Sequence, residues 1–439
     1  MDPMVLTLLV LVLVMVGFFS GKFSFALVSV TAITILEIGG VLTAKEAWVG
    51  FSDKSVVLTV ALFVLGGGLA KTSLITRLKH LLKDYKGDSK YAVWAILGAS
   101  ALLAVCTASN IAAATLIPVI ISLSEGNPNL SRTQLIKSSG DMMNIWTGTL
   151  PLGMAADTFM MMNSIVENMG GAGNFKVMDM TIAKALPVLA CTIWQFAYGY
   201  KLSNKEPNSP LKEFGLKLPE LPKGKLTTMT PFQDKAALFL FAASVVGMVF
   251  VSVKPAAWTS LSFLTTNIVA VVCAILMVLC GCLNEKEAFG SISWNIVFMF
   301  AGLLPLSTAM SNSGADQAIS GAIQKMLGGT TNGFIIVGLF FLITVILTQF
   351  MSNTAVGMIF LVLAAATSLN MGIDPKAAMM AAGIGSTVSV LSPIASPAQT
   401  MVWGTGGYTI KDFLRSGVPL TVIFFVVYMF TAPFIFPLY

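Results

Sequence analysis

Charged residues are scarce in this sequence. Only 10% of its 439 residues are Asp, Glu, Lys or Arg, whereas 56% are apolar, and the mean hydropathy is +0.85. A soluble domain carries about 25% charged residues, because its surface faces water. A water-facing globule of this length would therefore lack the charge to cover its surface. The composition excludes soluble enzymes, nucleic-acid-binding modules and disordered scaffolds, and it indicates a protein that crosses a membrane several times.

The residues that build most catalytic centres are also few. The chain has one histidine and five cysteines, and none of them has the spacing of a metal site. A membrane-embedded enzyme would need histidines, cysteines or paired carboxylates at one depth, and the sequence contains no such group. The net charge of +6 is not accompanied by a basic patch interleaved with aromatic residues. The sequence therefore predicts neither an enzyme nor a nucleic-acid partner.

Long apolar segments are abundant. A membrane-crossing helix needs about 20 mostly apolar residues. Ten segments qualify, roughly 4–20, 24–42, 55–75, 133–161, 180–200, 233–252, 259–282, 292–312, 375–402 and 417–438. The first follows an acidic leader, whereas a signal peptide has a positive one, so we interpret it as a retained span. Three consecutive glycines at 66–68, in the third span, indicate close helix packing.

Two further apolar stretches, 90–123 and 332–367, are too long for one crossing and carry polar residues near their middle. At 1.5 Å per residue, 34 residues would extend to about 50 Å, against a hydrocarbon core of about 30 Å. Each stretch therefore predicts a re-entrant hairpin, with its tip at 107–111 or 349–354. Irregular backbone at such depth persists only where protein or a water-filled cavity satisfies it, so the tips are candidate binding sites.

The two halves of the sequence repeat one order of elements, with an offset of 243 between Ser109 and Ser352. Each half reads as three spans, an amphipathic segment, a hairpin, a span interrupted by Gly, Pro or Ser, and a last span. The interruptions centre on 147–153 and 392–397. Five crossings per half is an odd number, so the second half must be inverted. Inverted repeats with broken helices in matching places are typical of secondary transporters.

The predicted fold class is an all-α integral membrane protein of two inverted repeats, each with five transmembrane helices plus a re-entrant helical hairpin. The repeats cover 1–202 and 233–439, and a cytoplasmic linker at 203–232 joins them. With the basic loop 77–90 in the cytoplasm, 19 of the 26 lysines and arginines lie on that side. The outer side then holds seven, Lys184 among them, and both termini. The expected location is the cell (inner or plasma) membrane.

Each hairpin tip presents the ends of two half-helices, with free N–H groups at one and free carbonyls at the other. The N–H end suits an anion. The carbonyl end, with Asn and Ser/Thr oxygens, suits a hard cation such as Na⁺. A single Ser-Asn pair in a membrane helix is more often a hydrogen-bonding contact between helices. Two pairs, each opposite a broken span, favour a binding site, and two closed tips argue against a channel.

The motifs resemble those of the divalent anion/sodium symporter family, which carries dicarboxylates, tricarboxylates or sulfate. The segment Thr-Gln-Phe-Met-Ser-Asn-Thr-Ala at 348–355 is similar to the second Ser-Asn-Thr motif of that family. The segment Ile-Ala-Ser-Pro-Ala-Gln at 394–399 resembles its Ala-Thr-Pro-Pro-Asn run. The first half is looser, with Ser-Asn-Ile-Ala at 109–112. The resemblance covers nearly the whole chain, and the wider ion-transporter superfamily shares the architecture.

The resemblance implies particular site residues. The substrate-binding residues would be Ser109, Asn110, Ser352, Asn353, Thr354, Ser396 and Pro397. One sodium site would be formed by Thr348, Met351, Asn353 and Ala395, and a weaker one by Thr107, Ser109, Asn110, Gly148 and Gly153. The resemblance further implies a small anionic substrate, Na⁺ as the coupled ion and a homodimer in the lipid bilayer.

The first half departs from the family pattern. At the offset of 243, Val105 stands opposite Thr348 and Ile111 opposite Thr354, so two hydroxyls are missing. This leaves open an anion exchanger or a proton-coupled carrier with little sodium dependence, and sulfate or a tricarboxylate as substrate. Asp141 and Asp157 flank the first interruption. They would either hold a proton or a cation there, or pair locally.

Overall fold

The computed structural model describes residues 2–20, 22–73, 89–106, 109–126, 130–150, 158–203, 229–253, 263–326, 332–406 and 408–436. Within these ranges the chain is helical and contains no strand. Some predictions fall elsewhere. Most of the basic loop 77–90, most of the linker 203–232, and Thr107, Gly153 and Asp157 lie outside the described residues, as do the side chains of Asn110 and Ile111.

The helices follow the predicted order of elements. Those of the first half are α1 (Pro3–Ser20), α2 (Phe25–Ile38), α3 (Ala44–Trp48), α4 (Lys54–Ala70), α6 (Ser89–Cys106), α7 (Ser109–Gly126), α8 (Arg132–Trp146), α9 (Thr158–Asn168) and α10 (Asp179–Ala197). Those of the second half are α11 (Pro231–Val253), α12 (Thr266–Leu279), α13 (Glu285–Ser291), α14 (Trp294–Ser313), α15 (Ala315–Met326), α16 (Gly333–Thr348), α17 (Asn353–Asn370), α18 (Pro375–Gly385), α19 (Pro397–Gly406) and α20 (Ile410–Ile435).

Several helices have the length and composition of membrane spans, as the sequence predicts. Among the described residues, six helical segments qualify: Ala44–Leu69, Asp179–Ala197, Pro231–Val251, Trp294–Ser313, Asn353–Asn370 and Ile410–Ile435. Shorter apolar helices accompany them, including α1, α2, α12 and α16. Large apolar side chains stay exposed on the outer faces, such as Ile193 on α10 and Phe430 on α20. Exposed apolar faces of this kind are suited to lipid, and the chain is a multi-pass membrane protein.

Each half contains, after its first two long helices, a related unit that the spans alone do not reveal. Residues 42–48 read Leu-Thr-Ala-Lys-Glu-Ala-Trp and residues 283–289 read Leu-Asn-Glu-Lys-Glu-Ala-Phe. In each unit a polar residue and a glutamate three positions later cap each other's backbone N–H, Thr43 with Glu46 and Asn284 with Glu287. This capping box starts a short helix, α3 or α13, ahead of a long apolar one. The shared unit strengthens the evidence for an internal repeat.

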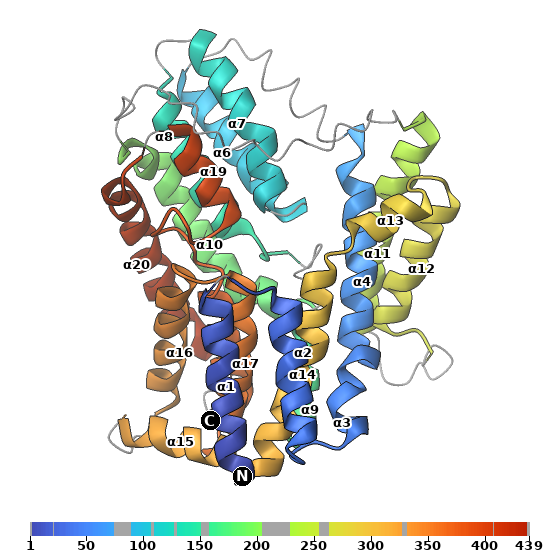
Figure 1. Ribbon diagram of the computed structural model, residues 1–439. Helices are drawn as coiled ribbons and strands as arrows, with labels where there is room; N and C mark the ends of the chain where they lie inside the picture. The colour runs from blue at the N-terminus through green and yellow to red at the C-terminus, as the bar shows by residue number, and fades with distance from the viewer. Residues whose placement is uncertain are drawn as a thin grey trace.

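Packing interleaves the two halves (Figure 1). Helix α2 packs on α14, and α4 packs on α12. The pair α6–α7 packs on α8, just as α16–α17 packs on α18. After the second interruption the chain packs on the first half, with α19 against α7 and α8 in the upper part of Figure 1. After the first interruption, α9 lies against α14 and α17 of the second half and against α4 of its own half.

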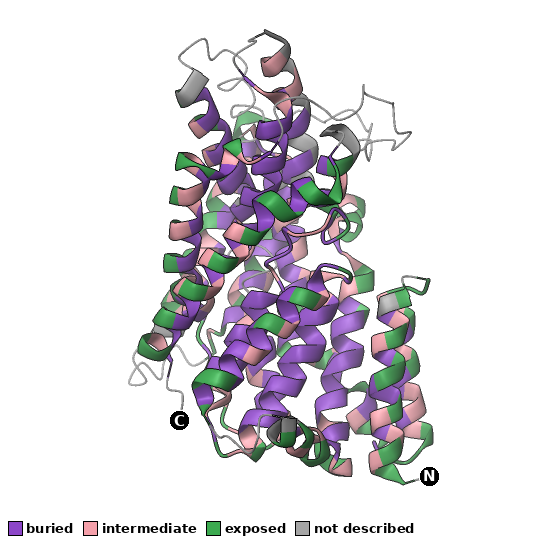
Figure 2. Cartoon of the chain, turned by 90° about the vertical axis from the view of Figure 1, so that its left-hand side faces the viewer, coloured by how far each residue is buried: buried purple, intermediate pink, exposed green. Residues whose placement is uncertain are grey.

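The buried residues lie mainly where helices face one another inside the molecule, and the exposed residues lie mainly on its outer faces (Figure 2). Close helix approach depends on glycine where α4 meets its neighbours. A Cβ on Gly67 would lie 2.1 Å from Oγ of Ser291, and one on Gly68 would lie 2.6 Å from Sδ of Met277. The close packing predicted from the glycine triplet is therefore confirmed for these two positions.

Candidate functional site

The second tip is a hydrogen-bonded cluster of neutral oxygens. Helix α16 ends at Thr348 and α17 begins at Asn353. The Thr348 hydroxyl lies 2.7 Å from Oδ1 of Asn353 and 2.8 Å from the carbonyl oxygen of Ser386. Nδ2 of Asn353 donates to Oγ of Ser389 at 3.0 Å. Two predicted residues of the sodium site, Thr348 and Asn353, are thus in direct contact.

Ser386 and Ser389 belong to the interruption that follows α18, and sequence reasoning missed both. They stand in a Gly-Ser-Thr-Val-Ser run at 385–389, directly after a helix. Hydroxyl-rich runs at a helix end are the available sequence signal. Ala395, which was expected in this site, makes no hydrogen bond to the cluster within the described part of the chain; its N–H donates to the carbonyl of Ser392 at 3.3 Å.

Gln349 fastens the second tip to the same interruption. Its Nε2 donates to the carbonyl oxygen of Val388 at 2.9 Å, and its Oε1 accepts from the N–H of Leu391 at 2.9 Å. The side chain is only 4% exposed, so both bonds are shielded from water. The Gln349 amide therefore pairs with one carbonyl and one N–H of the irregular backbone after α18. These two hydrogen bonds connect the second tip to the interruption that follows α18.

The predicted anion contacts of the second half lie at two helix N-termini. Ser352 is the N-cap of α17, and its hydroxyl and that of Thr354 have no hydrogen-bond partner among the described residues. Ser396 precedes α19, and its Oγ accepts from the N–H of Gln399 at 3.2 Å. Pro397 opens α19, and both Pro397 and its neighbour Ile394 are exposed. Met351 is buried beside the tip.

The first tip differs in chemistry. Helix α6 ends at Cys106 and α7 begins at Ser109, which is partly exposed. Val105 is a buried apolar residue here, with no oxygen to offer. The chain leaves α8 at Thr147 and turns at Gly148, whose φ of 71° lies in the left-handed region that favours glycine. Gly148 is thus explained by the turn.

Lys184, which the charge count assigned to the outer side, lies where the two interruptions meet. It lies in α10 and is fully buried. Its Nζ donates to the carbonyl oxygen of Thr147 at 2.7 Å and to Oγ1 of Thr387 at 3.1 Å. The predicted span 180–200 already contained Lys184, and α10, which begins at Asp179, turns this side chain toward the protein. One ammonium therefore contacts both broken spans.

A second buried lysine has a counter-ion. Lys137 forms an ion pair with Asp141 one turn along α8, and both side chains are fully buried. The Lys137 ammonium lies 4.6 Å from the centre of the Phe413 ring, and Nε2 of Gln399 donates to Oδ1 of Asp141 at 2.9 Å. Asp141 is thus paired locally, one of the two alternatives for it. Gln399 ties α19 to α8.

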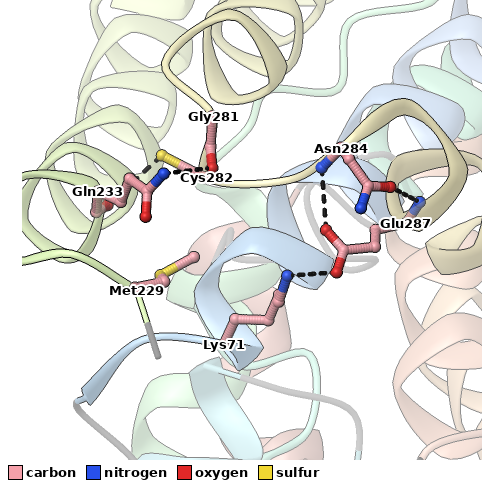
Figure 3. A pocket seen from close by; sticks show the side chains of 7 residues that line it. All are labelled: Lys71, Met229, Gln233, Gly281, Cys282, Asn284 and Glu287. Atoms are coloured by element: carbon pink, nitrogen blue, oxygen red, sulfur yellow. Dashed lines mark hydrogen bonds and ion pairs between the residues drawn. The ribbon is translucent and has the colours of Figure 1, made fainter. Parts of the chain in front are cut away.

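A separate cavity of about 180 Å³ lies near the end of α4 (Figure 3). It is lined by Lys71, Met229, Gln233, Gly281, Cys282, Asn284 and Glu287. Lys71 and Glu287 form an ion pair of 2.7 Å, and the Lys71 hydrogen bond is the main cause that lowers the pKa of Glu287. Nε2 of Gln233 donates to the carbonyl of Gly281. These polar groups satisfy one another, and the cavity shares no residue with either tip.

Several apolar spans, paired helices with polar tips, and broken helices that meet at a buried ammonium define a secondary transporter. The comparison with protein families agrees with this class. The chain belongs to the CitMHS family, described as citrate transporters, whose model matches residues 9–385. The resemblance to sodium-coupled anion transporters is confirmed at the level of the family, and so is the prediction that the protein is not an enzyme.

The relatives that the chain resembles are transporters whose names give different substrates or none. The chain is 40% identical over 147 residues to an uncharacterized transporter of Synechocystis sp., which is 34% of this chain and 24% of that protein. It is 28% identical over 161 residues to sodium/sulfate cotransporter 1 of Chlamydomonas reinhardtii, 36% of this chain and 18% of that protein. The chain thus matches about a quarter or less of these two. The sodium-dependent dicarboxylate transporter SdcS of Staphylococcus aureus is 21% identical over 440 residues, 94% of this chain and 82% of that protein.

A solved structure shares the fold. The YdaH transporter of Alcanivorax borkumensis superposes with a TM-score of 0.61 over 90% of this chain and 89% of that chain, at 13% sequence identity. At such identity the likeness concerns the arrangement of helices alone.

Proposed function

We propose that this protein is a secondary active transporter that carries small divalent anions, dicarboxylates above all, across the cell membrane by alternating access coupled to sodium. The observation that supports the sodium coupling is the neutral oxygen cluster at the second tip. Hydroxyl, amide and carbonyl oxygens of Thr348, Asn353, Ser386 and Ser389 lie within one hydrogen-bonded group. Hard cations such as Na⁺ prefer oxygen ligands, and this set carries no fixed charge.

The anion would bind at the helix N-termini beside that cluster. The hydroxyls of Ser352, Thr354 and Ser396 stand at the starts of α17 and α19, where backbone N–H groups and the helix dipole favour negative charge. From the first half, Ser109 and Asn110 would complete the site. Sodium at the Thr348–Asn353 cluster would offset part of the substrate charge, so cation and anion would each raise the affinity for the other.

The same proposal includes the predicted architecture. Two inverted repeats, 1–202 and 233–439, would each move a re-entrant hairpin with its broken span against a scaffold of the remaining helices, and the scaffold would form a homodimer. The recurring capping boxes and the crossing of α9 and α19 to opposite halves support the repeat. The Gln349 clamp supports joint movement of tip and interruption.

A second candidate is an exchanger or a proton-coupled carrier with little sodium dependence. Val105 favours it, because the first tip lacks the hydroxyl that Thr348 supplies in the second. The substrate class is wider than dicarboxylates in the relatives, whose names include sodium/sulfate cotransporter, and the family is described as citrate transporters. Sulfate and citrate therefore belong in any test beside succinate.

Transport into proteoliposomes tests this function. Uptake of labelled succinate, citrate and sulfate is measured with and without an inward sodium gradient, and we expect sodium to accelerate succinate uptake. Thr348→Val should abolish the acceleration. Thr344→Val is the matched control, because Thr344 is a buried residue one turn earlier whose hydroxyl bonds only to carbonyls of its own helix. Uptake independent of sodium would favour the exchanger, and no uptake of any of the three anions would refute the proposal.

A further inference from the structure

Lys184 is a buried amine with no acidic partner in the described part of the chain. Its side chain is fully buried, and its two hydrogen-bond partners are neutral oxygens, the carbonyl of Thr147 and the hydroxyl of Thr387. An ammonium has three donors, so one remains unassigned. Transfer of an unpaired ammonium from water into a protein interior costs several kcal/mol. Such residues within membrane spans are functional candidates.

Lys137 provides the internal comparison. It is equally buried, but it has the Asp141 carboxylate and the Phe413 ring to offset its charge. Its charge is therefore compensated within the fold whatever the protein binds. Among the described residues a protonated Lys184 has only dipoles to offset its charge, so an anion nearby would lower its free energy.

The position of Lys184 corresponds to that of a tip hydroxyl in the other half. Helix α8 ends at Trp146 and the carbonyl of the next residue, Thr147, accepts from Lys184. Helix α18 ends at Gly385 and the carbonyl of the next residue, Ser386, accepts from Thr348. By the sequence offset of 243, Val105 corresponds to Thr348 and offers no hydroxyl, whereas Nζ of Lys184 donates to the carbonyl that follows α8. A helix C-terminus favours positive charge, which suits an ammonium as well as a metal ion.

Lys184 is also next to the candidate sodium cluster. Thr387 lies between Ser386 and Ser389, which contact Thr348 and Asn353. The ammonium from the first half therefore touches the interruption that carries the cluster of the second half. Any anion bound between the two interruptions lies in the field of this charge, and a low-dielectric surrounding weakens that field little.

We propose that the ammonium of Lys184 is a built-in cation that takes the place of a sodium ion in the first half and serves as the fixed counter-charge of the transported anion. This inference rests on the proposed transport function and specifies how it is coupled. In this proposal Lys184 balances one of the two negative charges of a dicarboxylate substrate. Sodium would then be coupled to transport only through the Thr348–Asn353 cluster.

Succinate binding to the purified protein in sodium buffer tests the role of the charge. Lys184→Gln keeps a hydrogen-bond donor but removes the charge, and the loss of a charged hydrogen-bond partner should weaken succinate binding by about 10- to 100-fold. Lys184→Arg keeps the charge and should bind more tightly than Lys184→Gln. Lys54→Gln is the control, because it also removes one positive charge, from an exposed pair with Glu167, and should leave the affinity unchanged.

The sodium-to-succinate flux ratio of the wild-type protein gives an independent readout that needs no variant to fold. With Lys184 as the first cation, the ratio should be one or below. A ratio of two or more overturns the inference, because a second sodium would need the place that the ammonium holds. Succinate affinity of Lys184→Gln within about twofold of wild type also overturns it, and leaves the transport function standing. If wild-type protein binds none of succinate, citrate and sulfate, the proposed function fails and the inference with it.

Discussion

The buried ion pair of α8 allows a quantitative prediction about stability. Lys137 and Asp141 are both fully buried and lie one turn apart. If Lys137→Met removes the cation, the Asp141 carboxylate keeps, among the described residues, the neutral donors Gln399 and Ser416. Removal of one partner from a buried ion pair typically costs about 3–5 kcal/mol, because the remaining charge is left uncompensated. We therefore expect Lys137→Met to lower the free energy of unfolding by about that amount.

Replacement of both partners should cost much less than the two single replacements together. Apolar residues of similar volume often substitute for a buried pair at little cost. Reversible unfolding in mixed micelles, with denaturing detergent as the variable, would compare Lys137→Met, Asp141→Leu and the double variant. The expected coupling energy is on the order of 3 kcal/mol, at the upper end of the range for residues in contact. The partly exposed pair of Lys71 with Glu287 is the control, where Lys71→Met should cost less than about 1 kcal/mol. A cost below about 1 kcal/mol for Lys137→Met, or simple additivity in the double variant, would refute the reasoning.

Two other predictions concern packing and pH. Gly385→Ala would place a Cβ 2.7 Å from the carbonyl oxygen of Phe341. Because the backbone there cannot easily shift, the free energy of unfolding in detergent should fall by about 1–3 kcal/mol. Gly321→Ala, whose Cβ meets nothing within 4 Å, is the control and should be neutral or stabilising; equal effects of the two substitutions would contradict the packing argument. The pKa of Glu287 is lowered from its ordinary 4.5 mainly by Lys71, so the unfolded chain takes up the proton first as the pH falls. The melting temperature of wild type should therefore exceed that of Glu287→Gln above pH 4.5, and the two should converge as the pH falls through the lowered pKa. A difference in melting temperature that persists in acid would show that the charge of Glu287 is not its source.

The helix ends that form the candidate site are predictable from local sequence. Thr348 and Asn353 bound a short polar stretch inside an apolar run, and this contrast placed the tip correctly between α16 and α17. The first interruption begins at 147, as glycine, proline and hydroxyl residues predict, whereas the second, expected around 392–397, already begins at 386. At the tip and at the first interruption, residues within one turn decide whether the helix continues, so periodicity and composition suffice.

The partners of those ends are not predictable in the same way. Ser386 is 38 positions from Thr348, and Thr387 is 203 positions from Lys184. Which hydroxyl meets which helix end depends on how α10, α16 and α18 pack, and no local pattern encodes it. The surroundings of Lys184 were not predictable for the same reason: whether a lysine near the start of an apolar span faces inward depends on how that helix packs.

The contacts of Lys184 also limit which helices can move relative to one another in the proposed alternating access. Its Nζ donates to Thr147 and to Thr387, so separation of the two interruptions would break a hydrogen bond from a charged donor, at a cost of about 1.5–3 kcal/mol. Gln399 and Asp141 add a second link of the same kind between α19 and α8. These links hold α8, α10, α18 and α19 together. The helices α4, α11, α12 and α13 pack chiefly on one another. Under the proposed function, these links predict that α10 moves with the two broken spans rather than with the scaffold helices α4, α11, α12 and α13.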